Sequence, residues 1–249
     1  MTEHRRQPQD RGRPPQGGGR PPRRDAPRRD EPRREPKYDP VHLPDDIVKE
    51  LHTTARPGKG EILVKVFADA AAAFQANDFD EAIMLGDQAK HMALRAVSIR
   101  EFLGLAYYHQ GRWQEAAREL STFRRISGTA EQNPVLADSY RAMGKSEKAL
   151  EYVDEIVRGT VPDSVYFEGA IVGAGAQADM DRLDDAIRRL EALDLQPKVA
   201  EAHHLRAWYM LGDLLARKGR FTQAREWFEA VASADPDMTD ASDRVEKLR

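Results

Sequence analysis

A short pattern that recurs at a nearly constant spacing is the feature that most limits what this chain can fold into. Five segments place an aromatic or apolar residue three positions before an alanine, with Ser146 as the polar exception. The segments are FDEA, WQEA, SEKA, LDDA and FTQA; their alanines, at 82, 116, 149, 186 and 224, are separated by 34, 33, 37 and 38 residues. Such a period is typical of an all-α solenoid in which each repeat is a pair of helices.

The residue types at these positions suggest how the helices of a pair pack. A small residue such as Gly104 or Gly212 lets the first helix approach the second, and the recurring alanine accepts that contact. The aromatic residue three positions before the alanine is expected to fill the space at the turn. Proline has no backbone N–H to donate to a helix, so it is expected between helices. The predicted boundaries accordingly contain Pro57, Pro162, Pro197 and Pro236.

This pattern resembles the tetratricopeptide repeat (TPR) family. The last repeat matches it at Trp208, Leu211, Gly212, Gly219, Phe221, Ala224, Phe228 and Pro236, with Leu215 where a tyrosine is usual. The second matches at Leu103, Gly104, Tyr107, Gly111, Trp113 and Ala116, but it has Leu120 in the later aromatic position and no closing proline. The resemblance implies a right-handed α-solenoid of about five TPR-like helix pairs in residues 61–236, between a capping helix and linker in residues 41–60 and a second capping helix in residues 237–249.

The stretch IVGAGAQA, residues 171–178, also matches the dinucleotide-binding pattern G-x-G-x-x-A, with Asp194 following near the expected distance. A dinucleotide-binding fold needs a helix, a turn and a second strand between Ala178 and Asp194. The intervening DRLDDAIRRLEAL instead predicts one amphipathic helix. Counting back from Ala186 places Ala174 in the small-residue position of the fourth repeat, so we interpret the cluster as helix packing and expect no cofactor.

Charge divides the chain into two parts. Residues 1–37 hold 12 basic and 6 acidic residues, a net charge of +6, whereas the remainder holds 27 basic and 36 acidic residues, a net charge of −9. The basic part also carries 8 of the 15 prolines, so we expect residues 1–40 to form a disordered Arg/Pro/Gly-rich tail. With no cysteine, no apolar leader and no long apolar run, the sequence indicates no disulfide, signal peptide or membrane span, and it favours a cytoplasmic location.

Other titratable residues give no catalytic or metal-binding pattern. The adjacent His203 and His204 are interpreted as a surface pair near the start of a long helix, because neighbouring helix positions diverge by about 100° and cannot chelate one ion well. The acidic pairs at 45–46, 80–81 and 184–185 are expected in or near the first turns of helices, where the helix dipole stabilises carboxylates. We therefore expect no metal and no enzymatic activity.

In TPR proteins the first helices line a concave face that binds segments of other proteins. The resemblance places the following residues on that face: Glu101, Tyr108, His109, Asp138, Arg141, Arg206, Tyr209, Asp213 and Arg217. Trp208 occupies a packing position instead and is expected to be largely buried. Leu105 and Asp138 depart from the residues of a carboxylate clamp, which disfavours binding of a chaperone C-terminus.

The layout of tail, LPDDI segment and degenerate repeats resembles a group of bacterial TPR proteins, and actinobacterial ones in particular, which implies a cytoplasmic adaptor. Our first hypothesis is a non-enzymatic scaffold that binds a protein segment in its groove. The alternative is an RNA-associated accessory protein that uses the arginines of the tail, where only Tyr38 is available to stack on bases. The identity of the partner and the oligomeric state stay open.

Overall fold

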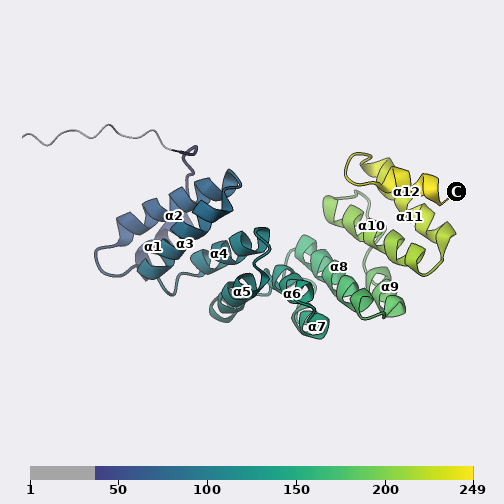
Figure 1. The fold of residues 1–249 in the computed structure, drawn as a ribbon, viewed down its shortest axis with the longest axis horizontal. Coiled ribbons are helices and arrows are strands. Elements are labelled where there is room, and N and C mark those ends of the chain that lie inside the picture. The colour runs from purple at the N-terminus through teal and green to yellow at the C-terminus, as the bar shows by residue number, and fades with distance from the viewer. Residues whose placement is uncertain (1–36, 249) are drawn as a thin grey trace, which may run out of the picture. The chain divides into compact units, whose positions relative to one another are not determined.

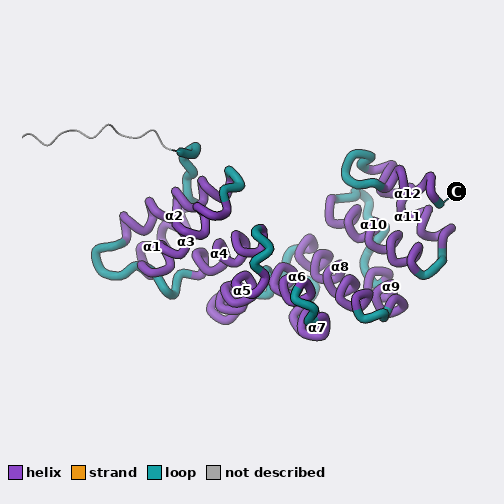
Figure 2. Tube along the Cα trace, in the orientation of Figure 1, coloured by secondary structure: helices purple, strands orange, loops and turns teal. Residues whose placement is uncertain are grey.

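A computed structural model describes residues 37–248 of the chain. This part contains twelve helices and no strand, apart from one isolated bridge between Arg158 and Val161 (Figures 1 and 2). The helices are α1 (Asp45–Thr54), α2 (Gly60–Gln75), α3 (Phe79–Met92), α4 (Val97–His109), α5 (Trp113–Ser127), α6 (Asn133–Ala142), α7 (Ser146–Asp154), α8 (Asp163–Asp179), α9 (Leu183–Glu191), α10 (Ala202–Arg217), α11 (Phe221–Ala234) and α12 (Ala241–Lys247). Of the predicted disordered tail, residues 1–36 lie outside the described residues.

Helices α2 to α11 form five antiparallel pairs, and each pair packs against the next. The second helices α3, α5, α7, α9 and α11 begin at the first residue of each repeated segment. All five repeated alanines are completely buried. The all-α solenoid is therefore confirmed, and so is the alanine as its shared packing position.

The same turn joins the two helices of every pair. The residue two positions before each second helix has a positive φ, between 59° and 79°; these residues are Asn77, Gly111, Gly144, Asp181 and Gly219. The next backbone N–H donates to a carbonyl in the last turn of the first helix, for example Arg112 to Tyr107 over 2.9 Å. This bond satisfies a carbonyl that the helix end leaves free. Asparagine and aspartate tolerate the left-handed conformation better than other non-glycine residues, so they can replace glycine in two of the five turns.

Glycines bring the paired helices together, as the sequence predicts. A methyl group placed on Gly104 would lie 2.4 Å from Leu120 Cδ2, and one on Gly212 would lie 3.0 Å from Phe228 Cε1. Leu120 thus fills the position that Phe228 fills in the last pair. The expectation for the turn aromatic is wrong at Phe221, which is 54 % exposed. α12, the helix that follows α11, has only seven residues, whereas α4, which follows α3 in the same way, has 13. α12 is therefore too short to cover the start of α11, where Phe221 lies.

The whole of IVGAGAQA lies inside the single helix α8. Ala174 is completely buried, in the small-residue position that the repeat predicts. α8 packs against α6, α7, α9 and α10, which accounts for its apolar and small residues on every side. Only the helix α9 and its flanking loops occupy the residues between Ala178 and Asp194, so the second strand of a dinucleotide-binding fold does not form.

The two outer helices cover the ends of the array of pairs. α1 packs on α2, and its Glu50 carboxylate accepts hydrogen bonds from the first backbone N–H groups of α4, at Val97 and Ser98. α12 packs on α11. Across residues 37–248, no helix has the length and apolar character needed to cross a membrane.

His203 and His204 are buried, with 5 % and 8 % exposure, so the expectation of a surface pair is wrong. Their rings lie 4.1 Å apart and pack edge-on against Phe167 of α8, at centroid distances of 4.7 and 4.8 Å. The backbone N–H of Glu201 donates to His204 Nδ1 over 3.1 Å, which helps to cap α10. The start of α10 lies against the preceding pair, which is why these two polar rings are buried.

Candidate functional site

Most of the predicted binding residues link one first helix to the next. The Tyr108 hydroxyl of α4 donates to Asp138 of α6 over 2.5 Å. Arg141 of α6 donates both to Asp138, over 2.8 Å, and to Asp179 of α8, over 3.2 Å. We call the face of α4, α6, α8 and α10 that carries these side chains the ladder face.

The ladder face continues at both ends of this central set. Arg206 of α10 pairs with Glu168 of α8. Arg217 is also directed at α8, with its Nη2 atom 3.5 Å from the Ala178 carbonyl oxygen. At the other end, Gln132, just before α6, donates to Glu101 of α4 over 2.7 Å. Polar contacts therefore connect α4, α6, α8 and α10 in sequence.

At the last pair, the predicted binding residues Arg206, Tyr209 and Asp213 divide between two neighbouring elements. The Tyr209 hydroxyl donates to Asp240 over 2.5 Å, and Arg244 of α12 donates to Asp213 over 3.2 Å. Arg206 instead contacts α8, so it does not join Tyr209 and Asp213 in one open row. The C-terminal helix therefore covers part of the surface that the sequence assigns to binding.

His109 is the one predicted residue that lies in an aromatic contact rather than a polar one. Its ring stacks on Phe79 at 5.0 Å with an angle of 6°, and it meets the edge of Phe74 at 5.4 Å. Phe102 joins α4 to α2 through contacts with Phe74 at 5.5 Å and Phe67 at 5.2 Å. Sequence reasoning missed this aromatic link between α2 and α4, although a Phe pair seven positions apart in α2 was available as a signal.

The links change the proton affinities of the groups that make them. Burial and the hydrogen bond to Asp138 raise the pKa of the Tyr108 phenol, and burial raises the pKa of the Glu101 carboxyl. The hydrogen bond from Tyr209 lowers the pKa of Asp240. Burial and the same hydrogen bond raise the pKa of the Tyr209 phenol, so Tyr108 and Tyr209 both stay protonated near neutral pH and keep donating to their carboxylate partners.

Trp208 is only partly buried, less than its packing position led us to expect. Its indole N–H donates to the Leu195 carbonyl over 3.0 Å, because the ring lies beside the loop that leads into α10. The structure places the residue in packing rather than in the ladder face.

Tyr38, the ring available to the RNA hypothesis, is bound to the body of the protein. Its hydroxyl donates to Asp78 over 2.7 Å, and Lys37 donates to the same carboxylate over 2.9 Å. These two donors lower the pKa of Asp78 to about 2. Residues 37–248 contain no group of three or more histidine or acidic side chains arranged to hold a metal ion.

Solved structures similar to this chain include two TPR proteins and a quorum sensor. The crystal structure of YrrB, a TPR protein with an unusual peptide-binding site, is 19 % identical, covers 74 % of this chain and 92 % of its own, and gives a TM-score of 0.52. The thermophilic TPR protein TTC0263 of Thermus thermophilus is 16 % identical, covers 75 % and 98 %, and gives 0.55. The apo quorum sensor NprR of B. thuringiensis is 15 % identical and gives 0.62, with 82 % of this chain and 61 % of NprR covered. These likenesses concern the fold.

No curated protein matches this chain. The family model described as "Tetratricopeptide repeat" matches residues 67–128 and 174–239, which together make up just over half of the sequence. The two matched regions contain four of the five repeated alanines, at 82, 116, 186 and 224. The matched regions, the repeated helix pairs and the solved structures agree: the chain belongs to the tetratricopeptide repeat family.

Proposed function

We propose that this protein is a non-enzymatic scaffold that binds a segment of another protein on its ladder face. The observation that carries the proposal is the series of side-chain links from α4 to α10, since they hold neighbouring first helices in one surface of alternating rings and charges. Membership of the TPR family supports a role in protein interaction. The peptide-binding site named for YrrB supports it further, by analogy of fold.

The exposed side chains of the ladder face suit a segment of mixed character. Arg206 keeps 43 % of its side chain exposed while it pairs with Glu168. His109 and Arg217 are exposed on the same series of first helices. A surface ion pair contributes about 0–1 kcal/mol, so a partner's charge can replace one member at small cost. We infer that rings anchor the segment and that these arginines set its orientation.

The test is affinity capture by the full chain, in parallel with thermal denaturation. We expect the double substitution Tyr209→Ala and Arg206→Glu to abolish capture of protein partners. Arg244→Ala is the matched control. It removes the contacts of the Arg244 side chain with Tyr209 and Asp213 but leaves Arg206 and Tyr209 in place. Arg125→Glu, on the exposed surface of α5, controls for charge. A folded double variant that keeps every partner would contradict the proposed site.

The RNA hypothesis has a separate readout in the same experiment. Capture is repeated after nuclease treatment and with a chain that begins at Lys37. Partners that survive both treatments support the scaffold. Partners lost after nuclease treatment and after removal of residues 1–36 support RNA contact through the basic segment instead. RNA binding that survives the removal of residues 1–36 contradicts a role for that segment.

A further inference from the structure

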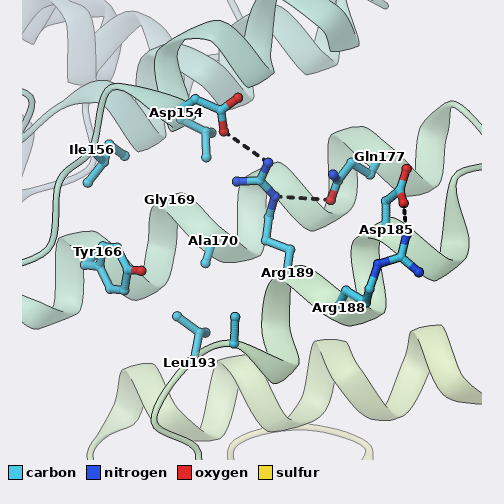
Figure 3. A pocket seen from close by; sticks show the side chains of 12 residues that line it. Asp154, Ile156, Tyr166, Gly169, Ala170, Gln177, Asp185, Arg188, Arg189 and Leu193 are labelled. Atoms are coloured by element: carbon cyan, nitrogen blue, oxygen red, sulfur yellow. Dashed lines mark hydrogen bonds and ion pairs between the residues drawn. The ribbon is translucent and has the colours of Figure 1, made fainter.

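A pocket of about 500 Å³ lies over α8, between the C-terminal ends of α7 and α9 (Figure 3). Gly169 and Ala170 of α8 line its floor, and Ile156, Leu193 and the ring of Tyr166 make one side largely apolar. Charged side chains of α9 line the other side. Pockets of about 300–1,000 Å³ are the usual size for small ligands. This pocket uses none of the ladder-face residues, so it is independent of the proposed function.

The glycines of α8 set the shape of this pocket. A methyl group on Gly169 would lie 2.4 Å from Ile156 Cδ1, so the bare backbone lets the chain after α7 come down onto α8. A methyl group on Gly173 would lie 3.0 Å from both Arg189 Cδ and Val153 Cγ1. The stem of Arg189 therefore rests directly on the backbone of α8. Gly173, which belongs to the small-residue cluster of residues 171–178, thus helps to position the arginine that lines the pocket.

Arg189 is held so that one end of its guanidinium remains available. Its Nε donates to Gln177 over 3.1 Å and its Nη2 donates to Asp154 over 3.0 Å. The third nitrogen, Nη1, has no partner among residues 37–248 and points toward the Gly169 side of the pocket in Figure 3. A guanidinium has five N–H donors in a fixed plane, so Nη1 offers two more N–H groups at the edge of the apolar side.

The other charges at the pocket already have partners. Asp154 accepts from Arg189, and Asp185 pairs with Arg188 one turn away on the same helix. Both carboxylates are well exposed, at 60 % and 44 %, so water screens their repulsion of an anion. Arg188, 67 % exposed, adds a second guanidinium at the rim. Arg189 Nη1, the donor that faces the apolar side, thus belongs to a cation held in a fixed orientation. The carboxylates of Asp154 and Asp185 lie at the solvent edge.

We propose that this pocket binds a small apolar monocarboxylate. The apolar body lies over Gly169 and Ala170 against Ile156, Tyr166 and Leu193, and the carboxylate accepts hydrogen bonds from Arg189 Nη1. A planar guanidinium matches a carboxylate better than any other side chain does. The carboxylate belongs either to a free acid or to the end of a chain, and the recognition chemistry is the same for both.

Two probes of similar shape, one a carboxylate and the other a neutral amide, test the proposal on the full chain. Binding of 3-phenylpropanoate and of 3-phenylpropanamide is followed by NMR chemical-shift titration of the α8 and α9 amides. We expect the acid to bind at least tenfold more tightly than the amide, with shifts at Gly169 and Ala170. Glycylglycylphenylalanine with a free carboxyl group shows whether the end of a chain is accepted as well. Equal affinities for acid and amide, or no binding of the acid at 10 mM, would overturn the proposal.

Two substitutions locate the binding. Arg189→Gln should lower the affinity for the acid at least fivefold and leave the affinity for the amide unchanged, because it removes the charge and the Nη1 donor. Arg182→Gln, at the exposed start of the same helix, is the matched control and should change neither affinity. Ala192→Phe, at an exposed position that lines the pocket, should weaken both probes by filling the space. Unchanged binding of the acid by Arg189→Gln or by Ala192→Phe would place the site elsewhere.

Discussion

The first two helix pairs, α2–α5, and the next two, α6–α9, share one alanine register but differ in the length of their second helices. α3 and α5 have 14 and 15 residues, whereas α7 and α9 have nine each. The chain after α7 and α9 runs through loops at residues 155–162 and 192–201, against the shorter loops 93–96 and 128–132 in the first region. The longer repeats, with alanine spacings of 37 and 38 residues, therefore owe their extra length to loop and not to helix.

The difference changes what one helix position can do. In α5 the seventh residue is Glu119, which is 2 % exposed and pairs with Arg100 over 2.6 Å and with Lys90 over 3.2 Å. In α9 the seventh residue is Arg189, which lines the pocket. The long second helix encloses its charge among cations from neighbouring helices, whereas the short one leaves its charge at an opening. A shared repeat register therefore does not fix a shared role.

The largest effect should come from the enclosed charge. Glu119→Gln leaves Arg100 without a carboxylate partner and leaves Lys90 with Asp87 alone, and breaking a buried ion pair costs about 3–5 kcal/mol. We expect the free energy of unfolding in urea to fall by about 3 kcal/mol. Arg189→Gln, at the equivalent position, should cost less than about 1 kcal/mol because its ion pair is partly exposed. Equal losses for the two variants would remove the distinction between the regions.

A smaller loss should follow from a methyl group added where the paired helices are closest. The new methyl of Gly104→Ala meets Leu120 Cδ2 at 2.4 Å, and overpacking of this kind costs about 1–3 kcal/mol. Thermal denaturation should show a lower Tm. The double variant with Leu120→Ala should recover part of the helix contact, which would appear as a favourable coupling in the double-mutant cycle. An unchanged Tm for Gly104→Ala alone would show that α4 and α5 have room to separate.

Mild acid should weaken the C-terminal side selectively. Burial, together with the neighbouring His204, lowers the pKa of His203 below its usual value of 6.5. The unfolded chain then takes up a proton more readily than the folded one, so this contribution to stability is present above pH 6.5 and is lost as the pH falls below it. Once the slower intrinsic exchange at low pH is divided out, the protection of the α8 and α10 amides from hydrogen exchange should fall between pH 7.5 and pH 5.0, by more than that of α2–α5. His203→Phe should remove most of that excess.

The smallest effect should be a gain in stability within α8. A methyl group on Gly175 would lie 3.5 Å from Arg141 Nη1, which is an ordinary contact. Gly175→Ala should therefore raise the free energy of unfolding by about 0.5–1 kcal/mol through helix propensity alone. Gly169→Ala is the opposing control, because its methyl meets Ile156 Cδ1 at 2.4 Å. Destabilisation by Gly175→Ala would show that Arg141 cannot adjust on the ladder face.

Much of the fold could be read from the sequence because the repeat is set by local sterics. The starts of the second helices follow from the residue three positions before each alanine, and Ala174 was placed correctly by counting back from Ala186. Exposure at the ends of the array was harder to predict. Phe221 is exposed because α12 is short. His203 is buried because Phe167, from the preceding helix pair, packs against its ring. These outcomes depend on neighbours that no local pattern specifies.

The candidate site could be predicted only as a set of residues on the first helices. The links Tyr108 to Asp138 and Tyr209 to Asp240 require the offset between successive helices, which the alanine spacing does not define to within a hydrogen-bond length. The pocket depends on where α7 and α9 end. The spacings of 37 and 38 residues were the available signal that loops lengthen there, but not that the helices shorten.

Every link along the ladder face joins residues between 30 and 39 positions apart, and none joins distant parts of the chain. The consequence concerns folding kinetics. Proteins rich in local contacts fold quickly, because little loop-closure entropy is lost before the first contact forms. A nucleus can therefore form at any pair and spread to its neighbours in either direction. A nascent chain can begin to fold as soon as two pairs have left the ribosome, without waiting for its C-terminal end.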